Sequence, residues 1–199
     1  MSACTLPEMI RIPFDDEPGR RRLLAEGWRE IEILETWDGE VPPVVAIPTA
    51  LRFRLAEPED GSELGEIAAS SFTHDRLHMD PAVAPAAAAE AKRKWVGDAL
   101  ADRLRTVLVA RVGSAPVGFL AWKRIKLRGR NAMLIDLLAV ASRCRRQGVA
   151  GALVGQGLKH CGFRLLRAGT QATNAAAKSF YESLGMGLVR RQRTFHRDR

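Results

Sequence analysis

Residues 132–161 constrain the fold more than any other part of the chain, because a buried strand there runs through a basic, glycine-containing turn into a helix. Residues 132–140 are apolar apart from Asp136, and residues 151–162 place apolar side chains at helical spacing. Between them the chain reads Arg145-Arg146-Gln147-Gly148-Val149-Ala150. We expect a strand over residues 132–140 and a helix over residues 146–161. A strand and a helix joined this closely are typical of a sheet covered by helices.

The other residues also alternate between strand and helix patterns. Residues 113–116 predict a turn between two antiparallel strands, and Asp38-Gly39 predicts a hairpin after a strand that begins near Trp28. These patterns predict an α/β fold with a mixed, largely antiparallel sheet and flanking helices. Further strands are expected at residues 51–55, 106–112, 117–125, 163–170 and 188–196, and helices at residues 17–26, 58–71, 86–100 and 175–184.

A proline-rich joint at residues 41–48 divides the chain into residues 1–48 and residues 50–199. The first part has too few apolar side chains to form a core of its own. We therefore expect a short helix-and-strand appendage that packs on one larger domain.

The charge of the chain leaves two classes of partner open. Lys and Arg number 31 against 23 Asp and Glu, which gives a net charge of +8. Such a charge is typical of a nucleic-acid-binding module, or of a positive funnel that captures a small anionic substrate. The 4 Trp, 1 Tyr and 7 Phe do not interleave with the basic clusters as a stacking surface for single strands requires. We expect no specific nucleic-acid partner, although charge alone does not decide.

The sequence also bears on location. No apolar run approaches the roughly 20 residues of a membrane span, and early acidic residues and prolines argue against a secretory signal. The three cysteines, Cys4, Cys144 and Cys161, lack Cys-x-x-Cys spacing and a histidine at zinc spacing. We expect reduced thiols in a cytoplasmic protein.

The turn at residues 145–150 has a physical use in binding anions. Its small residues let successive backbone N–H groups turn toward one point, and the start of the following helix adds a partial positive charge. Such a nest fits a pyrophosphate, beside which Arg145 and Arg146 add full charges. An ordinary glycine-softened turn is the alternative interpretation.

A second motif, at residues 174–186, reads Asn-Ala-Ala-Ala-Lys-Ser-Phe-Tyr-Glu-Ser-Leu-Gly-Met. The two motifs in this order resemble the GCN5-related N-acetyltransferase (GNAT) family, whose loop has the form Q/R-x-x-G-x-G/A and whose later segment reads N-x-x-A-x-x-F-Y-x-x-L-G-F. The resemblance covers residues 50–196, with Met186 in place of the usual Phe. It implies the GNAT fold and the transfer of an acetyl group from acetyl-CoA to an amine.

The resemblance also implies which residues bind acetyl-CoA. Asn174 would hold the pantetheine arm, and Tyr181 would stand beside the thioester sulfur, where a phenol can donate a proton to the departing thiolate. Tyr181 could instead only cap the core. The strand residues Leu138, Ala139 and Val140 would pair with pantetheine, and the pyrophosphate would bind the loop formed by Arg145, Arg146, Gln147, Gly148, Val149 and Ala150.

The general base is left open by the sequence. Asp136 lies in an apolar strand just before the segment expected to pair with pantetheine, and burial can raise the pKa of such a carboxylate. Asp136 could equally be a structural acid that pairs with an arginine of the basic hairpin, whose basic residues are Lys123, Arg124, Lys126, Arg128 and Arg130. We carry both interpretations forward.

Residues 69–81, with residues 91–96, resemble the dTDP-fucosamine N-acetyltransferases, and residues 23–36 resemble the end of their truncated N-terminal domain. This resemblance implies a nucleotide-linked amino sugar as acceptor. The chain departs from that pattern at Thr73-His74, at Leu77 and in the short N-terminal region, so the resemblance implies the reaction and not the particular sugar. The expected substrate residues are Phe72, Arg76, His78 and Asp80.

Three alternatives stay beside this prediction. Residues 72–81 could form a solvated surface loop with an Asp75–Arg76 pair, and the acceptor could be another small amine or a protein amino group. His74 and His78 have the spacing of metal ligands, but no third ligand is near in sequence, so we expect no metal. A homodimer is possible.

Overall fold

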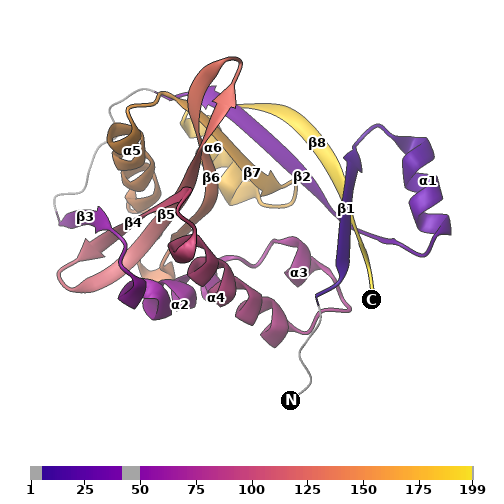
Figure 1. Cartoon of the computed structure of the whole chain (residues 1–199), viewed down its shortest axis with the longest axis horizontal. Helices are drawn as coiled ribbons and strands as arrows, with labels where there is room; N and C mark the ends of the chain where they lie inside the picture. Colours follow the sequence, from indigo (N-terminus) through magenta and orange to yellow (C-terminus); the bar gives the residue numbers. More distant parts are fainter. Residues whose placement is uncertain (1–5, 42–49, 199) are drawn as a thin grey trace.

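The computed structural model describes residues 6–41 and 50–198. Cys4 and nearly all of the predicted proline-rich joint lie outside the described residues. One eight-stranded sheet has the order β1-β8-β2-β7-β6-β5-β4-β3, and all neighbours are antiparallel except β6 and β7, which are parallel. This architecture confirms the predicted mixed α/β fold (Figure 1).

The strands are β1 (Glu8–Pro13), β2 (Arg29–Glu40), β3 (Leu51–Leu55), β4 (Arg105–Val112), β5 (Ala115–Leu127), β6 (Arg130–Val140), β7 (Leu165–Gln171) and β8 (Gly187–Arg197). The helices are α1 (Glu17–Ala25), α2 (Gly61–Ser71), α3 (Arg76–Met79), α4 (Pro85–Ala101), α5 (Val149–Cys161) and α6 (Ala175–Ser183), with short 3₁₀ turns at Pro58–Asp60 and Ser142–Cys144. Within these described residues, no helix is long and apolar enough to cross a membrane.

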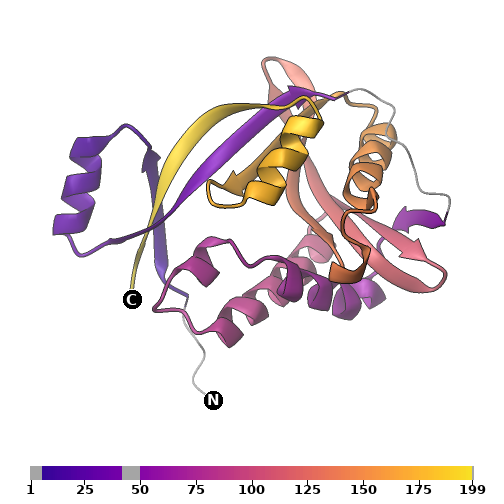
Figure 2. The same ribbon diagram turned by 180° about the vertical axis from the view of Figure 1, so that it is seen from behind.

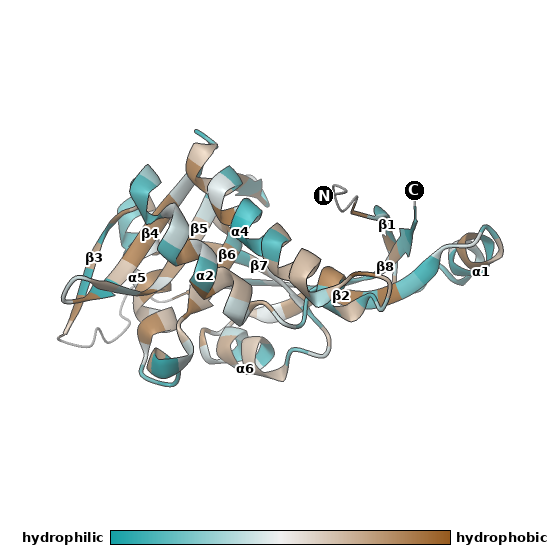
Figure 3. Cartoon of the chain, turned by 90° about the horizontal axis from the view of Figure 1, so that it is seen from below, coloured by the Kyte–Doolittle hydropathy of each residue, from teal (hydrophilic) through white to brown (hydrophobic). Residues whose placement is uncertain are grey.

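Helices cover both faces of the sheet and form two cores. On one face, α2 and α4 pack against β4–β6 through Leu64, Val96 and Phe119. On the other, α5 and α6 pack through Leu153, Leu166 and Tyr181. Figure 3 shows hydrophobic residues gathered where the helices cover β4–β6, with α1 at the opposite end of the molecule.

The N-terminal segment is built into the sheet. β2 lies between β7 and β8 and pairs with both, and β1 adds the outermost strand beside β8. α1 closes a small cluster of its own with Leu23, Ile12 and Phe195. The expected appendage therefore supplies backbone hydrogen bonds to the middle of the sheet, and β1 itself was not predicted.

The predicted hairpin at Asp38-Gly39 is wrong. β2 continues to Glu40, and Asp38 lies opposite Arg167, whose Nε and Nη2 donate to the Asp38 carboxylate at 2.6 Å and 2.6 Å. A Cβ on Gly39 would lie 2.7 Å from the Cα of Met186. The glycine thus serves a close approach of two backbones rather than a turn.

β6 and β7 separate soon after they begin to pair. Their parallel register covers only Ala132–Leu134 on β6 and Leu165–Arg167 on β7, and the strands then diverge (Figure 2). On its other edge β6 stays paired with β5, apart from a bulge where Leu137 faces Ala121 and Ile135 faces Trp122. Asp136 is the extra residue of that bulge.

Candidate active site

The turn before α5 has the geometry of an anion nest. Gly148 is the N-cap of α5 with φ +77°, and no side chain caps the helix start. Arg146 also has a positive φ, of 62°. The left-handed residues turn the chain so that backbone N–H groups of Gln147, Val149 and Ala150 stay available at a helix N-terminus, where an anion is stabilised. The predicted helix start at Arg146 is three residues too early because these positions form the turn.

Arg145 ties the loop to the end of α2. Its Nε donates to the Val140 carbonyl at 3.1 Å, and its Nη2 donates to Ser71 Oγ at 3.1 Å. Ser71 Oγ in turn donates to the Val140 carbonyl at 3.4 Å. The segment that begins at Phe72 therefore starts beside the expected cofactor loop, a link that the sequence did not reveal.

The open edge of β6 provides a surface for an extended chain. Leu138 and Val140 pack toward the core under α5, and Ala139 packs toward α2 and α4. β5 occupies one edge of these residues, and in the described chain β7 no longer pairs with the other. The backbone groups on that edge face the gap between the two strands.

Tyr181 lies on α6 with only 6% of its surface exposed. Its ring is 6.4 Å from the Trp37 ring and 5.7 Å from the Phe180 ring, measured between centroids. Burial alone raises the pKa of Tyr181 to about 12. The phenol therefore stays protonated and can donate. The Trp37 indole N–H, which the sequence did not single out, is buried there without a partner among the described residues.

Asn174 is the N-cap of α6. Its Oδ1 accepts a hydrogen bond from the Ala177 backbone N–H at 3.1 Å, so the carboxamide oxygen holds the start of the helix that carries Tyr181. The side-chain nitrogen is not part of this bond and is the atom that can meet a ligand.

Asp136 takes part in two ion pairs. Its Oδ2 lies 2.7 Å from Arg105 Nε and 3.3 Å from Lys123 Nζ. Lys123 belongs to the basic hairpin strand β5, and Arg105 to β4. This geometry corresponds to the structural acid that the sequence left as an alternative to a general base.

Residues 72–80 form a partly buried wall rather than a solvated loop. Phe72 packs against the same cluster as Ala139. Asp75 is buried and bonded to Lys92 of α4 and to His78, whose Nδ1 lies 2.6 Å from Asp75 Oδ2. The short helix α3, where only a loop was expected, follows because Asp75 caps it by accepting from the Leu77 N–H at 2.9 Å.

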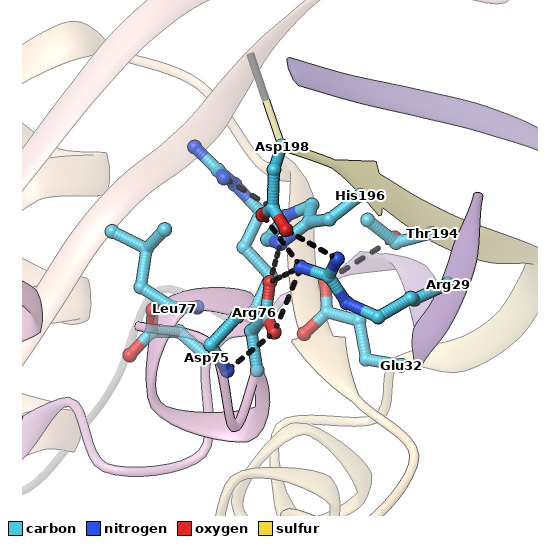
Figure 4. A network of polar contacts seen from close by, with 10 residues as sticks. Arg29, Glu32, Asp75, Arg76, Leu77, Thr194, His196 and Asp198 are labelled. Carbon is cyan, nitrogen blue, oxygen red and sulfur yellow. Dashed lines mark hydrogen bonds and ion pairs between the residues drawn. The ribbon is translucent and has the colours of Figure 1, made fainter. Parts of the chain in front are cut away.

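Asp80 is held by groups from both ends of the chain, among them Arg29 and His196, which are labelled in Figure 4. Its Oδ2 accepts from His196 Nδ1 at 2.7 Å and from Arg29 at 3.2 Å, and its Oδ1 accepts from the Ala82 N–H at 3.0 Å. Its side chain is fully buried. Both oxygens are occupied, so the contacts of Asp80 anchor the wall and leave no oxygen for a substrate hydroxyl.

Arg76 is a half-buried cation beside this network. Its Nη1 lies 3.0 Å from His196 Nε2. Burial lowers the pKa of His196, which keeps the imidazole neutral, with Nδ1–H donating to Asp80 and Nε2 accepting from Arg76. Burial and then the charge of Arg11 lower the pKa of the Arg76 guanidinium. Arg76 thus carries a positive charge that its hydrogen-bond partner does not neutralise.

No group of three or more His, Cys, Asp or Glu side chains in residues 6–41 and 50–198 could hold a metal ion. His78 uses one ring nitrogen for Asp75.

These observations fit acetyl-CoA. The start of α5, where no side chain caps the helix and Gly148 is left-handed, offers N–H donors for a pyrophosphate. The open edge of β6 offers donors and acceptors for an amide-containing arm. Tyr181, which is protonated, lies on helix α6. The class of protein that this fold and site define is a GNAT acyltransferase, and the comparison of sequences agrees: residues 65–186 match the Acetyltransferase (GNAT) family. The chain belongs to this family.

Among individual relatives, a protein of Bacillus subtilis (strain 168) named spore coat polysaccharide biosynthesis protein SpsD is 29% identical over 153 residues. The match includes 73% of this chain and 50% of SpsD, so the chain spans about half the length of that relative.

Solved structures share the fold. A conserved protein of unknown function from Staphylococcus epidermidis gives a TM-score of 0.69 at 14% identity, over 96% of this chain and 72% of that one. A GCN5-related N-acetyltransferase from Kribbella flavida gives 0.59 at 14% identity, over 94% and 67%. A tandem GNAT protein from the clavulanic acid biosynthesis pathway gives 0.59 at 15% identity, over 95% and 62%.

Proposed function

We propose that the protein transfers acetyl from acetyl-CoA to the amine of a nucleotide-linked amino sugar of the dTDP-4-amino-4,6-dideoxyhexose type. The observation that carries the proposal is Arg76, a half-buried guanidinium whose hydrogen-bond partner is the neutral His196. A guanidinium in this state is suited to a phosphate, which can accept two parallel hydrogen bonds. The relative named for polysaccharide biosynthesis supports sugar chemistry.

The roles of the chain's own residues follow from the site. Backbone N–H groups of residues 146–150 would bind the pyrophosphate, and residues 138–140 would pair with the pantetheine arm. Asn174 would hold that arm through its side-chain nitrogen, while Tyr181 would donate a proton to the departing sulfur. The unpaired thiols of Cys144 and Cys161 fit a cytoplasmic location.

Phe72 and His78 would complete the acceptor site with Arg76. Phe72 lies directly after Ser71, which is bonded to the end of β6 and to Arg145. The acceptor wall and the cofactor loop are therefore joined by hydrogen bonds, which lets both reactants be held in one geometry.

The first experiment is a binding measurement followed by a screen. Excess acetyl-CoA should raise the melting temperature of the protein, and Gly148→Val should abolish the rise because a branched side chain disfavours a positive φ and blocks the approach of phosphate. Acetyl transfer is then measured for amino-sugar nucleotides beside polyamines, aminoglycosides and peptides.

We expect the highest kcat/KM on an amino-sugar nucleotide. Transfer confined to polyamines, aminoglycosides or peptides would overturn the proposed acceptor and favour another small amine or a protein amino group. An unchanged melting temperature would overturn the site itself.

A further inference from the structure

We propose that His78 is the general base of the reaction and accepts a proton from the acceptor amine. The proposal rests on the proposed function, because it places the acceptor at the wall formed by residues 72–80. The observation behind it is an imidazole held at one nitrogen by a buried carboxylate and open at the other.

The two nitrogens of His78 have different surroundings. Nδ1 lies 2.6 Å from Asp75 Oδ2, and because the carboxylate can only accept, Nδ1 carries a hydrogen. In the neutral imidazole the lone pair is then on Nε2. The side chain is 18% exposed, so a ligand can reach it. This is the arrangement in which a carboxylate orients an imidazole base and stabilises the imidazolium that forms.

Asp75 is fixed in its ionised form. Burial alone would raise the pKa of Asp75, but the hydrogen bond and charge of Lys92 outweigh it and leave the pKa lowered. Lys92 is fully buried on α4 and lies over the Trp95 ring, 3.6 Å from its centroid. Asp75 also accepts from the Leu77 N–H. The carboxylate that orients His78 is therefore held from α4 and from α3.

The other carboxylates near the wall of residues 72–80 are either bonded to neighbouring groups or buried. Asp136 is engaged by Arg105 and Lys123, and both oxygens of Asp80 are bonded. Glu32 on β2 is only 7% exposed, and its Oε1 is bonded to Thr194. Figure 4 shows Glu32 and Asp75 on opposite sides of Arg76. Among these groups His78 offers a basic nitrogen, Nε2, that no cation of the described chain engages, on a side chain that is 18% exposed.

The proton transfers balance as follows. Nε2 of His78 takes one proton from the acceptor ammonium, which frees the nitrogen lone pair. The nitrogen attacks the thioester carbonyl carbon, so that a C–N bond forms and the C–S bond breaks. The thiolate takes the Tyr181 proton, and the second proton lost by the nitrogen returns to Tyr181. One amide and one thiol are formed, and His78 releases one proton to solvent.

The charged groups around the Asp75–His78 pair come from each element packed against it. Asp75 contacts His78 directly, Lys92 contacts Asp75 from α4, and Glu32 of β2 and Arg76 of α3 act on the same cluster through their charges. Asp75 is the charge in direct contact with the imidazole.

The test compares His78→Gln with His74→Gln. His74 lies in the same segment but is exposed and bonded only to the neighbouring Thr73 among the described residues. With dTDP-4-amino-4,6-dideoxygalactose as acceptor, His78→Gln should lower kcat by roughly 10²- to 10⁴-fold, the range for loss of a positioned base. His74→Gln should stay within about twofold. Both variants should keep the melting-temperature rise with acetyl-CoA.

Two further readouts separate catalysis from structure. In His78→Gln the rise of kcat with pH should move to higher pH, where the acceptor amine loses its proton without help, and transfer to hydroxylamine, an amine already neutral at pH 7, should be nearly unchanged. Equal loss on both acceptors, or a pH profile of kcat identical to that of the wild type, would refute the base role.

The comparison is repeated on the most active amine of the screen. If no sugar nucleotide is acetylated but His78→Gln still loses transfer to that amine, the proposed acceptor fails and the base stands. If His78→Gln equals His74→Gln on that amine, the base fails, whatever the acceptor.

Discussion

At the scale of single residues, Tyr181 shows how burial keeps a phenol protonated. Packing against Trp37 and Phe180 removes water from the phenol and raises its pKa to about 12. A raised pKa makes the hydroxyl a weaker acid, and it also means that the phenol keeps its proton at neutral pH, as the proposed role of proton donor requires.

Tyr181→Phe should therefore retain acetyl-CoA binding and lower kcat by roughly 10²- to 10⁴-fold, because only the proton donor is lost. The measurement is steady-state kinetics beside a thermal shift with acetyl-CoA. Phe180→Leu, which changes the neighbouring ring but no proton, is the control and should cost less than about tenfold. An unaltered kcat in Tyr181→Phe would leave Tyr181 a packing residue and water the donor.

The sequence predicted Tyr181, Asn174 and the loop at residues 145–150 because each lies in a short, contiguous motif. It could not predict the partners of Asp80. Arg29 and His196 reach Asp80 from the two ends of the chain, and only the strand order brings β2 and β8 beside α3. Trp37 was missed for the same reason, since nothing next to it in sequence marks it as a neighbour of Tyr181.

At the scale of elements, the wall of residues 72–80 is held at both of its ends. Ser71 bonds to the end of β6, while Asp80 bonds to β8 and β2 through His196 and Arg29. Such anchoring fixes α3, which carries Arg76 and His78, relative to the sheet. Positioning of this kind matters because misplacing a catalytic group by about 1 Å can cost about 100-fold in rate.

Asp80→Asn should destabilise the fold by about 3–5 kcal/mol at pH 7, because it breaks a buried pair and leaves Arg29 without its carboxylate. His196, Arg29 and the Ala82 N–H hold the pKa of Asp80 below its ordinary value despite the opposing effect of burial. Its stabilisation is therefore present above the unfolded value near 3.8 and is lost as pH falls through the lower folded value.

Urea unfolding at several pH values tests this. The gap between wild type and Asp80→Asn should narrow below about pH 4. Asp98→Asn, which removes an exposed carboxylate paired with Lys94 at 2.8 Å, should change stability by less than about 1 kcal/mol at any pH. A gap that stays constant down to pH 3 would show that the charge of Asp80 does not carry the effect.

The element boundaries show where local signals fail. Asp38-Gly39 has a turn signal, yet β7 and β8 pair with both sides of β2 at this point, and the ion pair to Arg167 extends the strand. Tertiary pairing thus overrides a local preference. Conversely, the predicted bounds of one strand and two helices lie within a residue or two of the observed ones, at residues 51–55, 86–100 and 175–184. In these segments the residue propensities, the hydrophobic period and the end residues all favour the same element.

At the scale of the whole molecule, the excess positive charge is partly used within the fold. Arg167, Arg130 and Lys123 are paired with Asp38, Glu40 and Asp136 on different strands. The composition could therefore predict a positive surface but not which cations stay available for a ligand. Arg76 stands out among the basic residues of the wall because its partner is neutral.

The last prediction follows from this charge. An acceptor that carries a diphosphate should be attracted to a chain of net charge +8, and salt should weaken that attraction, since charges are screened over about 10 Å at about 0.1 M ionic strength. KM for an amino-sugar nucleotide should therefore rise several-fold with added salt, whereas KM for the free amino sugar should not rise.

Arg76→Gln should raise KM for the nucleotide by about 10-fold or more, the value of a charged hydrogen bond, and leave KM for acetyl-CoA within about twofold. Arg21→Gln removes the same charge from an exposed site on α1, where the side chain is 77% exposed, and should change neither constant appreciably. Equal effects of the two variants would mean that overall charge, and not contact with Arg76, governs capture of the acceptor.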